Sequence, residues 1–263
     1  MNKPLQYENE FIRHKGSLES FIFRFVCNRQ DMEDIVQETY IRVVENIDSF
    51  QNRSSFKTWI FTIASNIAKN HLKKQHLWKE YYQDRAEALH LKSDELLQKL
   101  INSHYSAPDI QFEIREHINY CFNCIVKTLN LSQQICLLLK EIYEFKIKEI
   151  MQITGFSEGK VKHNLSYARK KMIDIFNNRC ALINKKGICS QCSSMMEVLH
   201  PEQNPVKKNR DVNLFMTDNN NNEADLLGLR MDLAKKIHPL KASNASLHIY
   251  LIEHLQEWAE IKN

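Results

Sequence analysis

Glycine and proline mark turns in most folds, and this chain of 263 residues contains only five of each. A many-stranded sheet needs such residues at its turns, and phosphate-binding loops need glycines so that the backbone can approach the phosphate closely. The sequence contains no G-x-G-x-x-G or P-loop spacing. Leu, Ile, Lys, Glu, Gln and Asn dominate the composition instead. The sequence therefore predicts an all-α chain, with more than one small domain because of its length.

The N-terminus has no apolar signal core, and no run approaches the roughly 18 apolar residues of a membrane span. We therefore expect a cytoplasmic protein with no membrane partner. The seven cysteines are an odd number and argue against a disulfide framework. Four of them lie in apolar helical patterns, where we expect small buried side chains: Cys27, Cys121, Cys124 and Cys136.

Two amphipathic helices are predicted near the N-terminus. The first covers residues 11–28, with Phe21, Ile22 and Phe25 pointing inward. The second covers residues 32–47 and is predicted to begin with Asp31 as its N-cap. Its buried stripe is predicted to contain Ile35, Val36, Tyr40, Val43, Val44 and Ile47.

A third amphipathic helix is predicted to follow Ser54 or Ser55, either of which can cap it. Its inward face is apolar, but a second face is neither plainly hydrophobic nor plainly solvated. That face carries Thr58, Thr62, Asn66, Lys69 and Lys73.

The charge of the N-terminal third is divided along the chain. Residues 31–56 contain six acidic and two basic side chains, whereas residues 57–85 contain six basic and two acidic ones. Such opposite patches suit a protein that holds two partners of opposite character, one of which is a candidate nucleic acid.

A helix-turn-helix is predicted between residues 146 and 176. A short helix ends at Thr154, Gly155 supplies a turn with positive φ, and Ser157 caps the next helix. That second helix contains five basic and two acidic side chains. In a DNA-binding helix-turn-helix the second helix enters the major groove.

The segment after Asn178 differs in composition from the rest of the chain. The spacing of Cys180, Cys189, Cys192 and His200 supplies four ligand types that suit tetrahedral zinc, although only one C-x2-C pair is present. A thiolate-bound metal, redox sensing and purely structural cysteines are all open interpretations. Polar linker sequence follows, and residues 226–261 then predict two amphipathic helices that dock against the protein itself. We hypothesise that this C-terminal extension covers the DNA-binding surfaces and so regulates the protein.

Two long segments together resemble a known family. The segment DMEDIVQETYIRVVENIDSFQNRSSFKTWIFTIASNIAKNHLKK resembles region 2 of sigma-70 type RNA polymerase sigma factors, especially the extracytoplasmic-function (ECF) group. The segment LNLSQQICLLLKEIYEFKIKEIMQITGFSEGKVKHNLSYARKKM resembles region 4 of the same family. The resemblance implies an all-α protein with two small helical domains joined by a flexible linker, plus a helical extension. The predicted divisions are region 2 at 1–85, a linker at 86–110, region 4 at 111–178, a cysteine-containing segment at 179–225 and C-terminal helices at 226–263.

The resemblance also implies an answer to the polar face of the third helix. In sigma factors this helix holds the unpaired non-template strand of the minus-ten promoter element, and the loop before it receives a flipped base. Trp59 matches the first of two adjacent tryptophans of housekeeping sigma factors, whereas Ile60 replaces the second. We therefore expect stricter promoter choice and weaker melting. The predicted minus-ten residues are Phe50, Arg53, Ser54, Thr58, Trp59, Thr62, Asn66, Lys69, Asn70 and Lys73.

Two further interfaces follow from the resemblance. Core RNA polymerase is the implied partner, through its β′ clamp helices and its β flap, and an anti-sigma factor is a further candidate partner. The residues predicted to bind the clamp helices are Asp34, Gln37, Glu38, Ile41 and Arg42, which would otherwise be an ordinary solvated face. The residues predicted to bind the minus-thirty-five element are Ser157, Lys160, Lys162, His163, Ser166, Tyr167, Arg169 and Lys170.

One position departs from the family pattern. Asn130 stands where the family usually has proline, and we expect this to soften the start of the helix that follows.

Two other functions are weighed. A helix-turn-helix regulator that never joins polymerase would leave the region 2 motifs without a purpose. A metalloenzyme is disfavoured because the sequence contains no H-E-x-x-H and no nucleophile elbow. We expect no catalytic residues and no cofactor, apart from the candidate zinc ligands in the extension.

Overall fold

The computed structural model describes residues 3–51, 53–73, 77–95, 97–98, 114–180, 222–242 and 245–260. The regular elements in these ranges are helices, which confirms the all-α prediction for the described part of the chain. Packing divides the chain into two compact units. The first contains Met1–His76 and Leu129–Ala168, and the second contains Leu77–Thr128 and Arg169–Asn263. The predicted functional divisions of the chain are a separate matter and stay a prediction.

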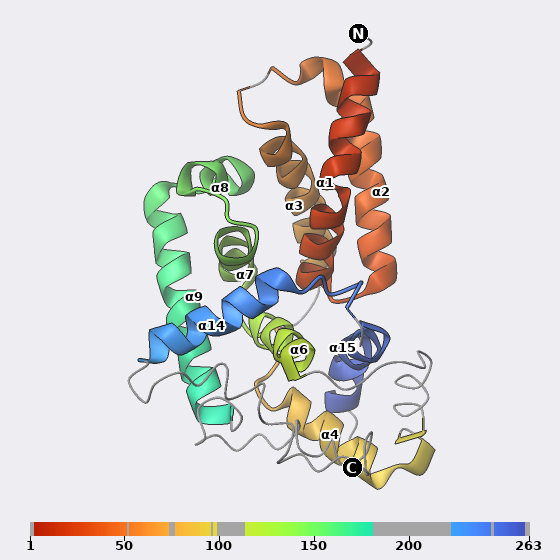
Figure 1. The fold of residues 1–263 in the computed structure, drawn as a ribbon, viewed down its shortest axis with the longest axis vertical. Helices are drawn as coiled ribbons and strands as arrows, with labels where there is room; N and C mark the ends of the chain where they lie inside the picture. Colours follow the sequence, from red (N-terminus) through yellow and green to blue (C-terminus); the bar gives the residue numbers. More distant parts are fainter. Residues whose placement is uncertain are drawn as a thin grey trace. The chain divides into compact units, whose positions relative to one another are not determined.

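Three helices form the N-terminal bundle of the first unit. They are α1 (Lys3–Val26), α2 (Arg29–Asn46) and α3 (Phe56–Leu72), each packed against the other two (Figure 1). A short 3-10 turn, η1 (Ile47–Ser49), follows α2. Helix α1 begins well before the predicted start at Phe11. The fully buried residues at the centre of the bundle include Leu18, Phe21, Ile22, Phe25, Ile60 and Phe61.

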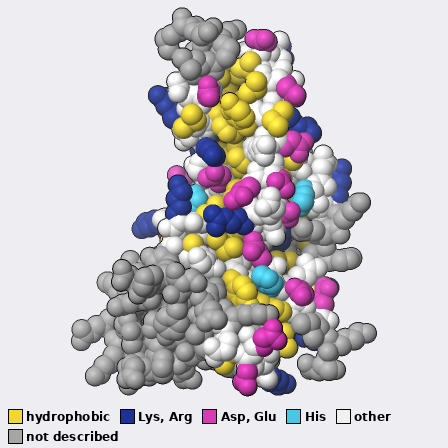
Figure 2. All heavy atoms as spheres, turned by 90° about the vertical axis from the view of Figure 1, so that its right-hand side faces the viewer, with side chains coloured by type: hydrophobic (Ala, Val, Ile, Leu, Met, Phe, Trp, Pro, Cys, Tyr) yellow, Lys and Arg dark blue, Asp and Glu magenta, His cyan; other side chains and the backbone are white. Residues whose placement is uncertain are grey.

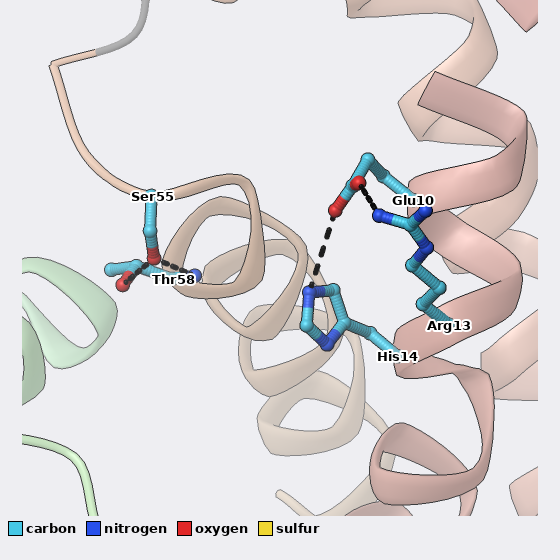
Figure 3. Close-up of polar contacts among 5 residues, drawn as sticks. All are labelled: Glu10, Arg13, His14, Ser55 and Thr58. Carbon is cyan, nitrogen blue, oxygen red and sulfur yellow. Dashed lines mark hydrogen bonds and ion pairs between the residues drawn. The ribbon is translucent and has the colours of Figure 1, made fainter. Parts of the chain in front are cut away.

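The caps of the bundle helices are settled by short polar side chains. Asn28 is the N-cap of α2, because its side chain accepts a hydrogen bond of 2.9 Å from the backbone N–H of Asp31. The predicted Asp31 cap is therefore wrong, and Asp31 lies in the first turn instead. Ser55 caps α3, as predicted, by accepting a bond of 3.1 Å from the backbone N–H of Thr58 (Figure 3).

The predicted buried stripe of α2 is correct only in part. Ile35, Val36 and Val43 are buried, but Val44 is 54% exposed. Successive residues on a helix point about 100° apart, so adjacent Val43 and Val44 cannot both face the bundle. The residues at 40 and 47 are half-buried.

The first unit also contains the helix-turn-helix. Helix α7 (Leu131–Leu137) continues through a π turn, η2 (Leu138–Ile142), and α8 (Ile147–Thr154) and α9 (Glu158–Arg179) follow. Residues of α9 up to Ala168 belong to this unit. Gly155 has φ of 71°, in the left-handed region that glycine adopts at least cost, which confirms the predicted turn. Ser157 accepts a hydrogen bond of 3.3 Å from the backbone N–H of Lys160, as its predicted capping role requires.

Asn130 stabilises the start of α7. Its side chain accepts a bond of 3.0 Å from the backbone N–H of Gln133, whose own side chain accepts one of 3.2 Å from the Asn130 backbone. This reciprocal capping box satisfies two N–H groups that the helix itself cannot pair. The expected softening at this position is therefore wrong.

The second unit combines the C-terminal extension with elements from the middle of the chain. Helix α15 (Ala245–Glu260) packs on α4 (Tyr82–Lys92) and α6 (Ile114–Val126), and α14 (Glu223–Lys236) also packs on α6. An ion pair joins Arg179 at the end of α9 to Asp84 on α4. The apolar stripe predicted for the last helix contains Leu247, Tyr250, Leu251, Leu255 and Trp258. All of these are buried except Tyr250, which is half-buried. The expectation that the C-terminal helices dock against the protein itself is therefore confirmed. Among the described helices, none has the length and apolar character needed to cross a membrane.

Candidate nucleic-acid interface

The second helix of the helix-turn-helix presents a continuous polar face. All eight residues predicted to contact the minus-thirty-five element are exposed. Val161, Leu165 and Ala168 lie between them in sequence and are buried. This alternation leaves the basic side chains of α9 in solvent while the apolar ones fix the helix to the fold.

Two of the α9 lysines have neighbours that orient them. The Lys162 ammonium lies 2.6 Å from the Glu158 carboxylate, one helical turn away. The Lys160 ammonium lies 4.1 Å from the centre of the Phe156 ring, in the turn before the helix. Such exposed contacts are weak, so both lysines remain available to neutralise phosphate charge.

The polar face of α3 is only partly in solvent. Asn66, Asn70 and Lys73 are exposed, and Thr62 and Lys69 are half-buried. Thr58 is only 1% exposed. The predicted minus-ten face is therefore open toward the C-terminal end of α3 and covered at its beginning.

Helix α8 and the segment before it provide this cover. The Thr58 hydroxyl donates a hydrogen bond of 3.3 Å to the Glu149 carboxylate on α8, and the Lys57 ammonium donates one of 3.4 Å to the backbone carbonyl of Tyr143. The Lys57 ammonium also lies 4.5 Å from the centre of the Phe145 ring. In Figure 1, α8 belongs to the green segment that packs on α3. Within the first unit, the helix-turn-helix thus occupies part of the face that was predicted to hold promoter DNA.

Helix α7 adds to this cover farther along α3. Burial lowers the pKa of the half-buried Lys69 ammonium, and the nearby Cys136 thiol of α7 raises it in part. Burial likewise raises the pKa of Cys136 to about 11, against the opposing charges of Lys69 and Lys160. The half-buried Lys69 ammonium therefore lies within electrostatic reach of the Cys136 thiol on α7.

The loop before α3 carries a cluster of aromatic rings. Phe50 stacks on Trp59 with ring centres 4.8 Å apart, and Phe56 stacks on Tyr7 at 5.3 Å. All four rings are half-exposed. In the same loop Arg53 is exposed and Ser54 is half-buried. Tyr7 was missed from the sequence, although its spacing of four residues from Phe11 extends the helical pattern of α1 upstream.

The outer face of α2 is polar and exposed to solvent. All five residues predicted to bind polymerase are exposed, including Ile41 at 47%. Arg42 and Glu38 form an exposed ion pair of 2.6 Å along this face.

A groove of about 370 Å³ lies between α1 and α2. Figure 2 shows hydrophobic side chains on this side of the molecule, with acidic ones beside them. Outside the groove lining, Glu10 of α1 forms ion pairs with Arg13 and His14 on the same helix (Figure 3). The groove is lined by Glu8, Phe11, Ile12, Lys15, Glu19, Glu33, Val36, Gln37 and Tyr40.

The prediction that four cysteines are small buried side chains is correct for three of them. Cys27, Cys124 and Cys136 are buried, whereas Cys121 is only half-buried. Of the four candidate zinc ligands, only Cys180 lies in the described part of the chain, and the other three lie outside it. No group of three or more metal-binding side chains occurs among the residues that the structure describes.

Comparison with known proteins identifies two segments of the chain. The chain matches the families described as Sigma-70 region 2, over residues 11–77, and Sigma-70 region 4, over residues 120–172. Among solved structures it is distantly similar to the sigma factor RpoE from Bartonella quintana, which was crystallised with the anti-sigma factor NepR. That likeness covers 65% of this chain and 97% of that one, at 19% identity and a TM-score of 0.46.

Two curated relatives are closer in sequence. The chain is 28% identical over 161 residues to the ECF RNA polymerase sigma factor SigX of Bacillus subtilis, which covers 59% of this chain and 77% of SigX. It is 40% identical over 63 residues to the ECF RNA polymerase sigma-E factor of Haemophilus influenzae, which covers 24% of this chain and 33% of that protein. With both regions matched in family order, the chain belongs to the sigma-70 family of RNA polymerase sigma factors, in its extracytoplasmic-function group.

Proposed function

We propose that this protein binds core RNA polymerase in the cytoplasm and directs it to promoters through two separate DNA contacts. The observation that carries the proposal is the presence, in one chain, of an exposed polar face on α2 and an exposed basic face on α9. A sigma factor needs both, because it must hold polymerase and DNA together. It performs no bond chemistry of its own.

The basic face of α9 is the proposed reader of the minus-thirty-five element. A recognition helix reads base edges with a few side chains near its start and holds phosphates with its lysines and arginines. His163, Ser166 and Tyr167 project between the basic residues and suit base contacts. Lys160, Lys162 and Arg169 suit phosphate contacts. Binding should weaken steeply with salt, because each neutralised phosphate releases counterions.

Helix α3 and the loop before it are the proposed minus-ten reader. Asn66 and Asn70 are exposed on α3 and offer donors and acceptors to unpaired bases. Lys73, in the last turn, offers a charge to the backbone of the strand. Engagement of the whole face, including Thr58, requires α8 to leave α3.

The outer face of α2 and the adjoining groove are the proposed site for the polymerase clamp helices. Its half-exposed Ile41 supplies an apolar anchor, and Glu38, Asp34 and Arg42 around it supply charge. Interfaces of this kind gain most of their energy from a few central side chains. Contact with the polymerase β flap through region 4 is proposed from the family resemblance.

Co-purification with core polymerase tests this function. The full chain should bind the core enzyme, whereas Ile41→Asp should lose most of the binding because it places a charge at the centre of the apolar contact. Ile12→Asp changes another exposed isoleucine, which lies in α1 and lines the groove. Its affinity for core polymerase shows whether the groove contributes to binding as the face of α2 does. If the unaltered chain binds promoter DNA but never binds core polymerase, it is a helix-turn-helix regulator rather than a sigma factor.

The zinc ligands remain a separate proposal. The thiolates of Cys180, Cys189 and Cys192, with the imidazole of His200, form a donor set of the kind that zinc prefers. Metal analysis of the purified full chain, compared with a Cys189→Ser variant, tests it. One equivalent of zinc in the first and none in the second would support the site, and equal zinc contents would contradict it.

A further inference from the structure

The cover on α3 is more than a surface contact. The Tyr143 ring enters the N-terminal bundle, with its centre 5.5 Å from that of Phe21 on α1 and 5.9 Å from that of Phe61 on α3. Its hydroxyl lies 2.8 Å from the Ser20 hydroxyl, within hydrogen-bonding distance. The buried Arg24 guanidinium also lies beside it, while burial raises the pKa of Tyr143. Region 4 is therefore anchored in region 2 by a polar group that has partners there.

A second contact is built around Phe145. This side chain is 2% exposed, and its ring centre lies 4.9 Å from that of Phe61. The Lys57 ammonium lies over the Phe145 ring, 4.5 Å from its centre. Between Tyr143 and Phe145, Glu144 has φ of 59°, a left-handed conformation that is unfavourable for a residue with a Cβ. The chain thus accepts a strained turn in order to place both rings against the bundle.

The cover and promoter DNA compete for the same atoms. Thr58 is 1% exposed and donates to Glu149, and Lys57 donates to a backbone carbonyl. A DNA strand on this face would have to replace both partners. The negative charge of the Glu149 carboxylate would also repel the phosphates of a DNA strand that approached Thr58. Helix α8 and the DNA strand therefore cannot occupy this face together.

We infer that residues 143–149 hold region 2 closed, so that this sigma factor blocks its own minus-ten face until region 4 separates from α3. The inference rests on the proposed function, since it assigns a regulation to the proposed minus-ten site. The partner of the site in the closed state is a segment of the same chain. Binding to core polymerase, which would engage region 2 and region 4 separately, supplies the free energy for opening.

A reversible lock tests the inference. A full-length Thr58→Cys/Glu149→Cys variant places one thiol on each of the two helices that this hydrogen bond now joins. Its disulfide is verified by mass spectrometry, and its binding to a single-stranded minus-ten oligonucleotide is compared before and after reduction. The unaltered chain and each single variant, treated with the same oxidant, control for the seven native cysteines.

The oxidised pair should bind the oligonucleotide at least tenfold more weakly than the reduced pair. Equal binding in both states would overturn the inference. A free chain in which neither the disulfide nor a short thiol-to-thiol crosslinker joins positions 58 and 149 would also overturn it, because α8 then does not cover α3. Failure of the unaltered chain to support transcription with core polymerase would instead contradict the proposed function.

A different observation carries a second inference at the other end of α3. Tyr7 lies upstream of the residues that match region 2, which begin at residue 11. Its ring nevertheless stacks on Phe56 and meets Phe50 edge-on, with centres 5.7 Å apart. Phe50 in turn stacks on Trp59. Helix α1 therefore contributes one wall of the aromatic cluster in the base-receiving loop.

We propose that Tyr7 is a further specificity residue, which stacks against the unpaired promoter base that the loop receives. Four half-exposed rings, with an exposed Arg53 in the segment between Phe50 and Phe56, suit a planar, uncharged base on an anionic backbone. Aromatic side chains bind unpaired bases in this way in single-strand binding proteins. A protein that bound this cluster would not need the cation of Arg53. The test below distinguishes such a protein contact from contact with a base.

Fluorescence of 2-aminopurine, placed in turn at each minus-ten position in a complex with core polymerase, tests this role. In the unaltered protein one position should be quenched by stacking. Tyr7→Ala should weaken the quenching at that position and lower promoter affinity about fivefold or more. Tyr7→Phe should preserve both, and Arg13→Ala, an exposed change on the same helix, should change neither. If the quenching by Tyr7→Ala equals that by the unaltered protein at every position, the proposal is overturned. It is also overturned if Tyr7→Ala loses only its affinity for core polymerase, because that would point to a protein contact.

Discussion

Replacing Phe145 by alanine should open the minus-ten face of region 2. The side chain is almost fully buried, and its contacts across to α3 are with the Phe61 ring and the Lys57 ammonium. An aromatic pair contributes about 0.5–1.5 kcal/mol beyond its area, and a cation over a ring about 0.5–2 kcal/mol. The closed arrangement should therefore lose roughly 1–3.5 kcal/mol relative to the open one. At 1.4 kcal/mol per factor of ten, that shifts the equilibrium toward opening by roughly 5-fold to 300-fold.

The affinity of the full chain for a labelled minus-ten single strand reports this shift. The apparent dissociation constant should fall by the same factor, up to the point where most molecules are already open. Fluorescence anisotropy measures it, and circular dichroism checks that the variant is folded. Phe176→Ala is the matched control, because it truncates a buried phenylalanine whose ring contacts Arg230 rather than α3. If folded Phe145→Ala binds the strand no more tightly than the unaltered chain, or if Phe176→Ala binds as tightly as Phe145→Ala, the reasoning is refuted.

Three further outcomes are expected. Stability should fall as the pH drops from 7 to 5, because burial lowers the pKa of His117 to about 4 while the unfolded chain takes up that proton below about 6.5. In urea unfolding, the free energy of unfolding of His117→Gln should fall by roughly 2 kcal/mol less between these pH values than that of the unaltered protein. An identical fall in both proteins would contradict a lowered pKa for His117. Tyr167→Ala, which removes a side chain 52% exposed on α9, should weaken binding to a minus-thirty-five duplex without changing the midpoint of thermal unfolding by more than about 2 °C. Leu255→Ala should destabilise the second unit by about 2–5 kcal/mol in denaturant titration, because Leu255 is fully buried, and a cost below about 1 kcal/mol would show that α15 is loosely docked.

Local sequence patterns predicted a large part of the fold. The helix-turn-helix was predicted in detail, because Gly155 and Ser157 act within a few residues of where they stand. The exposed face of α2 followed from helical periodicity, and the exposed face of α9 followed from the resemblance to region 4. Local rules failed where two similar signals stood close together. Asn28 and Asp31 can both cap a helix, and Val43 and Val44 can both be buried, so that only packing decides between them.

The packing of α8 on α3 could not be predicted in this way. Thr58 and Glu149 are separated by 91 residues, and no local sequence pattern that contains one of them predicts a contact with the other. Thr58 belongs to a mixed polar face in the sequence, and nothing in that pattern predicts the contact with Glu149 that helps to bury it. Tyr7 was missed for a similar reason, since the whole of α2 separates it in sequence from its partners Phe50 and Phe56. Contacts that regulate or complete a site are thus the part that periodicity does not encode.

Transcription by purified core polymerase tests the central claim, that this chain joins polymerase and selects promoters through two DNA contacts. Run-off transcripts from a random promoter library, made with and without the full-length protein, are sequenced. The account predicts that the protein enriches templates with two short conserved boxes at a constant spacing, and that changes on α9 alter only the upstream box while changes on α3 alter only the downstream one. Transcripts unchanged by the protein, or enrichment of a single box that responds to α9 alone, would contradict it.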